Sequence, residues 1–484
     1  MTTAAAKRNL PLPSDAIDRD AWSRAHDDLV AFLRDLIRIP SINPPDPPGA
    51  ELDAARYIAA TLEDAGLEPE VLEPTPGRGS VVARLRGDGT AGEPLLLLSH
   101  LDVVPAPGDG WTHDPFAADV ADGYIWGRGA VDMKDMVALE VGVLRLLAAR
   151  ARSAGRNPAT DPIPGLGRDV LFASTADEEA GGLHGAGWLV NHRPETLRAA
   201  GALNECGGVA TDILGRRLYP IGVAEKGYSV YRITIHGTWG HGSMPRDDNA
   251  AVRAATAIGR LAAPGTPRLT APMHRFLAAL AAELPDDTAR LVLAIGDPDP
   301  SRSDAAIRRL CDPMYGRAAR ALLRDSISPD MVQAGIKYNV IPGEATVVID
   351  CRTLPGTTEA AMRADVERRL GDLADVATIE LIITADPVEA STETELYRLL
   401  ETTVVAHDPG AGPVPVMMAF ATDAKHTVKL GIPTYGFSPL RLEPEERFLE
   451  RFHGVDERVG LDALRWGLPV LYDVVATYCA SRDG

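Results

Sequence analysis

The chain has 484 residues, of which 45% are hydrophobic and 24% are charged, a balance typical of a globular protein of two or three domains. Its 49 basic and 68 acidic residues give a net charge of −19. We therefore expect neither nucleic acid nor a membrane surface as partner, because both attract a basic face. Four cysteines without paired spacing, no long apolar run and no secretory signal predict a cytoplasmic protein without a transmembrane helix.

The first part of the chain alternates apolar strand patterns with helical ones. Alternating elements of this kind predict an α/β fold in which helices cover both faces of a sheet. We expect helices over 20–37, 51–65 and 134–151, and strands over 80–86, 94–100, 169–175 and 201–204. The segment 94–100 (PLLLLSH) is apolar throughout, as in a strand buried on both faces.

The pattern changes near Glu225, where Gly227–Gly237 alternates cleanly between apolar and polar residues. The following segments predict the order β-α-β-β-α-β of a small α+β domain, interrupted by a helical insertion. We expect its other strands over 331–337, 345–352 and 377–384, its helices over 249–262 and 358–370, and the insertion over 264–328. After Thr384 the first pattern resumes. The predicted fold is thus a catalytic domain with a mixed sheet, residues 1–224 and 387–484, interrupted by an inserted α+β domain, residues 225–386.

Residues of metal-binding type follow several of the predicted strands. They are His100 and Asp102 in SHLD, Asp132 before a helix, Glu178 and Glu179 in TADEEAGG, Glu205 in NECGG, and His453 in FHGVDER. Each has a simpler reading on its own: a turn for the first pair, a helix cap for Asp135 or Asp132, a solvated loop for the acids, and a capping or core histidine near the C-terminus.

Taken together, these side chains predict a metal site, because open α/β sheets place their sites at the carboxyl ends of strands. Carboxylates mixed with imidazole suit zinc, cobalt or manganese. Five ligands are too many for one tetrahedral zinc that keeps a water, and they suit two metals that share a carboxylate.

Several longer motifs resemble the zinc aminoacylase/carboxypeptidase family, which includes acetylornithine deacetylase, succinyl-diaminopimelate desuccinylase, aminoacylase-1 and glutamate carboxypeptidase. The resemblance covers residues 20–480. It is carried, in the expected order, by HLDVVPAPGDGWTHDPFAADVADGYIWGRGAVDMKD, DEEAGGLHGA, NECGG, GHGSMP, NVIP, the D-x-R of 350–352, TDA and HGVDERV. The helical insertion is most similar to carboxypeptidase S-like members.

The resemblance implies two metal ions, zinc or else cobalt or manganese. It implies that His100 and Glu205 bind one metal, that Glu179 and His453 bind the other, and that Asp132 bridges them. It also implies a cis peptide bond after Asp132.

Further roles follow from the same resemblance. Asp102 orients His100, and Glu178 acts as the general base. In the inserted domain, His241 reaches the active site of a neighbouring subunit, while Asn339 and Arg352 hold the carboxylate of the substrate. The inserted domain is then a lid through which the protein forms a homodimer.

One segment departs from the family pattern. Phe420-Ala421 precede Thr-Asp-Ala where many members have Gly-Gly, and Lys425-His426 stand where an arginine is common. Since this loop lines the substrate pocket in relatives, the substrate stays open. We expect hydrolysis of an amide bond in an N-acyl amino acid or small peptide; a dipeptidase, a C-terminal exopeptidase, a sugar-amide or carbamate hydrolase, and a catalytically inactive metal-binding homologue are the alternatives.

Overall fold

The computed structural model describes residues 12–43, 49–442 and 451–482. The chain forms two compact units. The first comprises 1–223, 390–414 and 422–484, and the second comprises 224–389 and 415–421. The domain boundaries at 225 and 386 that the sequence suggests remain a prediction.

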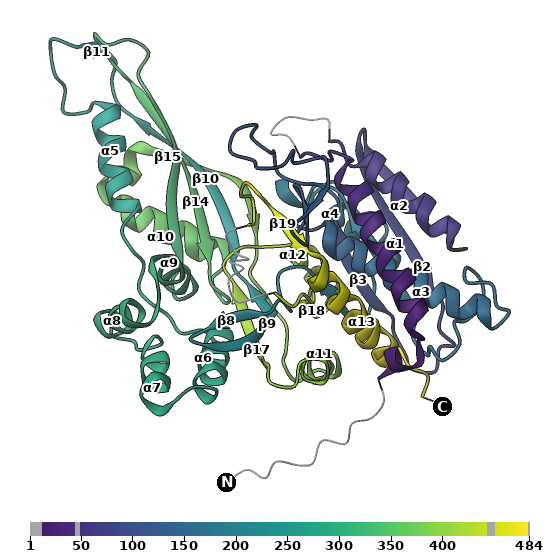
Figure 1. The fold of residues 1–484 in the computed structure, drawn as a ribbon. Coiled ribbons are helices and arrows are strands. Elements are labelled where there is room, and N and C mark those ends of the chain that lie inside the picture. Colours follow the sequence, from purple (N-terminus) through teal and green to yellow (C-terminus); the bar gives the residue numbers. More distant parts are fainter. Residues whose placement is uncertain (1–11, 44–48, 443–450, 483–484) are drawn as a thin grey trace. The chain divides into compact units, whose positions relative to one another are not determined.

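The first unit is built on a mixed sheet (Figure 1). The strand order is β1 (Glu70–Thr75), β2 (Arg78–Leu85), β6 (Val170–Thr175), β3 (Leu95–His100), β7 (Gly201–Asn204), β18 (Thr434–Gly436) and β9 (Arg216–Glu225). The four strands from β6 to β18 run parallel, whereas β1, β2 and β9 pair antiparallel with their neighbours. The predicted mixed α/β sheet is therefore present.

Helices cover both faces of this sheet because alternate side chains of each strand point to opposite sides. Leu95 and Leu97 of β3 share a core with five helices, whereas Leu96 and Leu98 pack with α4 (Ala186–His192). The five helices are α1 (Arg19–Ile37), α2 (Leu52–Asp64), α3 (Lys134–Ser153), α11 (Glu395–His407) and α13 (Leu461–Tyr478). A strand buried on both faces explains the continuous apolar run in the sequence.

Short elements complete the first unit. A small sheet has the order β19 (Arg458–Gly460), β5 (Tyr124–Trp126), β4 (Asp119–Ala121), and β8 (Thr211–Ile213) pairs with β9. The remaining short elements are α12 (Ala424–Thr427) and 3-10 turns at Pro13–Ala16, Glu178–Ala180, Pro194–Thr196 and Val428–Leu430. The strand β17 (Gly412–Met418) spans the limit between the two units.

The second unit contains a four-stranded antiparallel sheet with the order β12 (Ser326–Ala334), β14 (Glu344–Thr353), β10 (Gly227–His236), β15 (Ala377–Ala385). Helices α5 (Ala250–Leu261) and α10 (Glu359–Leu370) share its core. A ribbon of β11 (Gly240–His241) and β13 (Val340–Ile341) lies beyond one end of this sheet (Figure 1). The predicted helical insertion contains α6 (Ala271–Ala282), α7 (Asp286–Ala294), α8 (Pro300–Leu310) and α9 (Pro313–Leu322); Gly371–Val376 is a 3-10 turn and Val388–Glu389 forms β16.

One predicted strand is displaced. The segment expected over 331–337 is β12, which begins at Ser326 and ends at Ala334, before Gly335 with its φ of +74°. Because proline is uncommon inside strands, Pro329 interrupts the strand pattern of the sequence, and the start of the strand is not predicted. The pairing of β12 with β14 shifts register between Pro329 and Met331. None of the described helices has the length and apolar character needed to span a bilayer.

Candidate metal centre

The ends of three parallel strands meet at one edge of the first unit's sheet. In the register of β3 and β6, His100 pairs with Thr175, and β7 continues the same sheet to Asn204. Asp102, the turn with Glu178 and Glu179, and Glu205 directly follow these strand ends. Because parallel strands end at the same edge, their polar side chains meet without any long loop.

Asp132 lies between two histidines and faces each with a different oxygen. Its Oδ1 is 3.3 Å from His100 Nε2, and its Oδ2 is 3.2 Å from His453 Nε2. Each histidine also has its own glutamate: Glu205 Oε2 is 3.7 Å from His100 Nε2, and Glu179 Oε1 is 3.3 Å from His453 Nε2. The structure thus brings together all five residues that the sequence suggests as metal ligands, in two groups with one carboxylate between them.

The donor atoms fit a pair of divalent cations. His100 Nε2 and Glu179 Oε1 are buried and have no hydrogen-bond partner among the described residues. Ligand atoms of His100, Asp132 and Glu179 lie within 4.8 Å of one another, as do those of His100, Glu178 and Glu205. Unpaired buried carboxylates and imidazole nitrogens are costly unless a cation joins them.

The charged groups of the site shift one another's pKa values, upward for the two histidines and downward for Asp132. Burial disfavours the charged imidazole of His100, but Glu205, Asp102 and Asp132 outweigh it and raise its pKa. The adjacent carboxylates of Asp132 and Glu179 raise the pKa of His453 to about 10. Although burial opposes ionisation of Asp132, the two histidines hold its pKa below its usual value. The raised pKa values of the two histidines report a concentration of negative charge that attracts positive charge into the site.

Asp102 is fully buried and holds the turn that follows β6. Its carboxylate accepts hydrogen bonds from the backbone N–H groups of Glu178 and Glu179, each at 3.0 Å. The ring of His100 is placed chiefly by the backbone of Asp102, since Nδ1 lies 2.9 Å from its carbonyl oxygen and 3.6 Å from Oδ1. The Asp102 carboxylate therefore contacts the Glu178–Glu179 turn more closely than the imidazole that it is expected to orient.

A buried network behind Asp102 escaped the sequence reasoning. Asn43 Nδ2 donates to Asp102 Oδ2 at 2.7 Å, and Arg78 donates to Asn43 Oδ1 at 2.9 Å. Arg78 also pairs with Glu51 and lies 3.5 Å from Asp177, the first residue of the acidic turn. These side chains are distant in sequence and carry no metal-ligand pattern, so only the tertiary structure reveals that they support the turn.

A second buried pair holds the backbone at Asp132. Glu457 Oε1 accepts from the N–H groups of Val131 at 2.9 Å and of Asp132 at 3.2 Å, while its Oε2 accepts from Arg128 at 2.6 Å. The signal was present in the sequence, since Glu457 belongs to the HGVDERV motif. The Asp132–Met133 peptide is cis, as the resemblance implies.

The helix-cap reading of Asp135 is wrong. Helix α3 has Met133 at its N-cap without a side-chain cap, and Asp135 lies inside the helix, buried. Burial raises its pKa well above the usual value.

The three expected substrate residues lie in the second unit. His241 is exposed on β11, where its Nδ1 is 2.7 Å from Ser243 Oγ. Asn339 lies beside it, because its carbonyl accepts from Gly242 N at 2.9 Å as β11 pairs with β13. Arg352 lies near the other end of β14, paired with Asp350 at 2.8 Å and stacked over Tyr228.

This separation is large. At about 3.3 Å per residue, the extended chain from Glu344 to Arg352 spans roughly 26 Å. One copy of the second unit therefore presents His241 and Asn339 together, and Arg352 apart from them.

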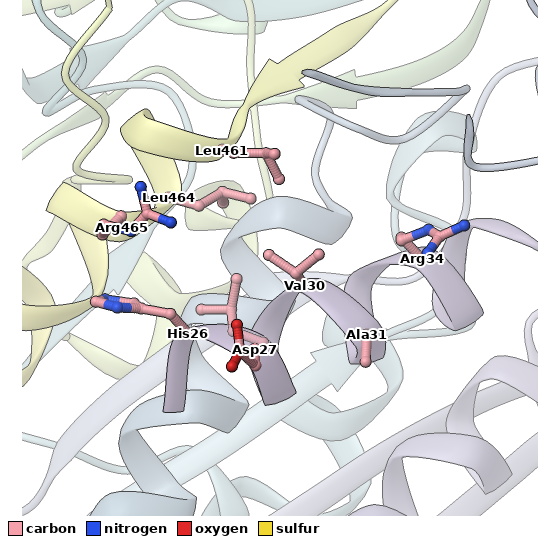
Figure 2. A pocket seen from close by; sticks show the side chains of 9 residues that line it. His26, Asp27, Val30, Ala31, Arg34, Leu461, Leu464 and Arg465 are labelled. Carbon is pink, nitrogen blue, oxygen red and sulfur yellow. The ribbon is translucent and has the colours of Figure 1, made fainter. Parts of the chain in front are cut away.

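A hollow of about 280 Å³ lies in the first unit, between α1 and the start of α13 (Figure 2). Its lining consists of His26, Asp27, Leu29, Val30, Ala31, Arg34, Leu461, Leu464 and Arg465. None of them is a predicted site residue, and the lining holds only one carboxylate and one imidazole, so it lacks the donor set of a metal centre.

The fold and the donor set define a metal-dependent hydrolase. The family model described as Peptidase family M20/M25/M40 matches residues 96–477, and the chain belongs to this family of metallopeptidases. This confirms the family that the motifs suggest.

Among curated relatives, the N-fatty-acyl-amino acid synthase/hydrolase PM20D1 of Xenopus tropicalis is 27% identical over 90% of this chain and 83% of its own. The probable carboxypeptidase S-like 2 of Dictyostelium discoideum is 31% identical over 78% and 70%. Among solved structures, the M20 family metallo-carboxypeptidase Sso-CP2 of Sulfolobus solfataricus aligns with a TM-score of 0.70 at 18% identity, over 93% of this chain and 99% of that one. At this identity the structural likeness bears on the fold alone.

Proposed function

We propose that the protein is a dinuclear metallohydrolase that cleaves the amide bond of an N-acyl amino acid or a small peptide. The observation that carries this proposal is the position of Asp132, which faces His100 with one oxygen and His453 with the other. His100, Glu205 and Asp132 would hold one metal, and His453, Glu179 and Asp132 the second. Zinc is the proposed metal, with cobalt or manganese as alternatives.

The chain's own residues then divide the work of hydrolysis. When bound, the metals supply an acidified water and a polarised amide carbonyl. Glu178 accepts the proton of that water and delivers it to the departing amine, because an unprotonated amine is a poor leaving group. Asp102 holds the backbone of the Glu178–Glu179 turn. The exposed imidazole of His241 would donate a hydrogen bond to the oxyanion.

We further propose that the inserted domain, residues 225–386, is a lid that forms a homodimer. The separation of Arg352 from His241 and Asn339 supports this, since one copy of the second unit cannot present all three to one small substrate. Two copies can, with His241 and Asn339 from one subunit and Arg352 from the other. Exposed apolar side chains beside the β11–β13 ribbon offer contact area: Trp239, Met244, Ile336 and Tyr338.

The substrate class rests on the relatives and the site. The names of the relatives mention N-fatty-acyl amino acids and a carboxypeptidase. An acyl amino acid and the carboxyl end of a peptide both carry an amide beside a free carboxylate. A dipeptidase or C-terminal exopeptidase is the nearest alternative, and a sugar-amide or carbamate hydrolase a more distant one. A catalytically inactive metal-binding protein is disfavoured, because Glu178 and all five ligand candidates are present. The four cysteines form no disulfide among the described residues, which supports the proposed cytoplasmic location.

The deciding experiment compares the unaltered enzyme with Glu178→Ala. Both are reconstituted with zinc, cobalt or manganese and screened on N-acyl amino acids, N-fatty-acyl amino acids and dipeptides. We expect hydrolysis of at least one class, and a loss of at least about 10²-fold in kcat in the variant, within the range for a general base. Both proteins should retain two metals per chain by elemental analysis.

Glu63→Ala, an exposed glutamate on α2, is the matched control and should leave the rate unchanged. If Glu178→Ala loses a metal equivalent, Glu178 is a ligand and not the base. If the unaltered, metal-loaded enzyme cleaves none of these amides, the proposed function is wrong.

A further inference from the structure

Lys425 has no role in the proposed chemistry, yet it is a buried cation in contact with the catalytic turn. Its side chain is 2% exposed, and its Nζ lies 2.6 Å from Glu178 Oε1. A second carboxylate, Asp423 Oδ1, lies 3.8 Å from the same nitrogen. Burying an ammonium group costs free energy unless carboxylates lie next to it. The contacts with Glu178 and Asp423 therefore stabilise the buried charge of Lys425.

The segment that carries Lys425 is fastened to the strand ends below it. Asn204 Nδ2, at the end of β7, donates to Thr422 Oγ1 at 2.8 Å. Thr175 Oγ1, at the end of β6, donates to Asp423 Oδ2 at 2.6 Å. The segment that carries Lys425 is thus held by hydrogen bonds from the ends of β6 and β7.

The same segment also contacts the acidic turn through His426. His426 Nε2 lies 2.9 Å from the carbonyl oxygen of Gly181. At Gly182, which has a φ of +72°, an added Cβ would come within 2.5 Å of Asp423 and 2.8 Å of His426. Gly182 therefore permits a close approach between this segment and the turn that carries Glu178.

We propose that Lys425 is a positioning residue for Glu178. It holds Oε1 by a charge-assisted hydrogen bond, so that Oε2 faces the attacking water and the leaving amine. With Oε1 engaged by Lys425, Oε2 is the oxygen assigned to this proton transfer. The proposal rests on the proposed function, in which Glu178 is the general base.

The geometry distinguishes this role from two others. A residue that binds the substrate carboxylate would act mainly on KM, whereas a residue that positions Glu178 acts on kcat. A residue that only neutralises buried charge could be replaced by any cation of similar size. A positioning residue requires the donor at one point, and a displacement of about 1 Å can cost on the order of 10²-fold in rate.

The experiment measures kcat, KM, metal content and melting temperature for Lys425→Met, Lys425→Gln and Lys425→Arg on a substrate that the unaltered enzyme cleaves. We expect Lys425→Met to lower kcat by about 10- to 10²-fold with KM changed less than about 2-fold and both metals bound. Lys425→Arg, which keeps a charged donor, should recover part of the loss. Lys429→Met removes an exposed lysine four residues on and should have no effect.

The double variant Glu178→Ala/Lys425→Met shows whether Lys425 acts through Glu178. If it does, the second substitution adds little to the loss caused by the first. Equal, additive losses, a rise in KM at constant kcat, or loss of a metal would each overturn the proposal; if Lys425→Met does not fold, the Gln and Arg variants give the same readouts. Glu178→Ala with undiminished turnover refutes the general base itself, and so separates failure of the proposed function from failure of this inference.

Discussion

Asp132 is the carboxylate that lies between the two histidines of the candidate metal centre. It is buried and contacts both histidines, whereas Glu205 approaches only His100 and Glu179 approaches only His453. A carboxylate shared by two cations contributes to the affinity of both, while a terminal ligand contributes to one. The five side chains are therefore not equivalent, and their removal should affect metal binding in different ways.

We expect Glu205→Ala and His453→Ala each to weaken one of two metal equivalents, and Asp132→Ala to weaken both. The measurement is a metal titration by calorimetry, with elemental analysis after dialysis. Loss of one ligand should lower the affinity of its metal by at least about 10- to 10²-fold, the range found for lesser changes around metal sites. Identical titrations for all three variants would contradict the bridging assignment.

At the scale of elements, helix α3 is buried along most of its length and carries three buried charged residues in its first two turns. Lys134 Nζ donates to the carbonyl oxygens of Leu36 at 3.0 Å and Ile39 at 2.8 Å, which ties α3 to the end of α1. Glu140 Oε2 accepts from Ser99 Oγ at 2.6 Å, one residue before His100. These contacts fix α3 against β3, whose last residue is the proposed metal ligand His100.

Glu140 makes the stability of this packing depend on pH. Burial raises its pKa from 4.5 to about 8, an effect that the hydrogen bond from Ser99 only partly offsets and that Asp135 reinforces. Between these two values the folded protein keeps a proton that the unfolded chain has lost. The protonated Glu140 side chain therefore contributes its full stabilisation below about pH 4.5, and this stabilisation is lost as the pH rises through about 8.

We predict that Glu140→Gln removes this dependence, since glutamine keeps the shape and an acceptor but does not ionise. Between pH 5 and 8 the free energy of unfolding of the unaltered protein should fall relative to the variant by up to about 1.4 kcal/mol per pH unit. Urea unfolding of both proteins at several pH values measures the difference, and other titrating groups cancel in the comparison. A constant difference across this range would mean that Glu140 titrates normally.

At the scale of the whole molecule, the chain forms two units with separate cores, and the proposed site residues are divided between them. All five ligand candidates, with Glu178 and Lys425, belong to the first unit, whereas His241, Asn339 and Arg352 belong to the second. A dimer of the proposed kind would combine these sets across a two-fold axis, so that each cleft uses residues of both subunits.

Mixed dimers test this arrangement. His241→Ala and Glu178→Ala should each be inactive alone, but in a mixed dimer one cleft combines an intact Glu178 with the partner's intact histidine, while the other cleft lacks both. With random exchange half of the dimers are mixed, so about a quarter of all sites should recover activity. Co-refolding followed by turnover assays measures this. No recovery, when exchange is demonstrated by differential labelling, would place His241 in its own subunit or outside catalysis.

Features that depend on short stretches of chain can be predicted from the amino-acid sequence. Apolar runs and helical periodicity located β3, β6, β7, α1, α2 and α3, because local patterning reflects which faces a segment buries. It also indicated the metal chemistry, since His100, Asp132, Glu179, Glu205 and His453 each stand in a recognisable motif. Strands of two or three residues, such as β5 and β18, are too short to carry such a pattern and were not predicted.

The contacts that support these side chains become visible only in the folded chain. The contact of Lys425 with Glu178 joins residues 247 positions apart, and Arg78 meets Asn43 and Asp177 from different elements. Such contacts arise when separate strands end at one edge of a sheet, and no local pattern encodes them. The motifs therefore indicate the candidate residues for the chemistry, while packing determines which neighbours hold the turn of Glu178 and Glu179.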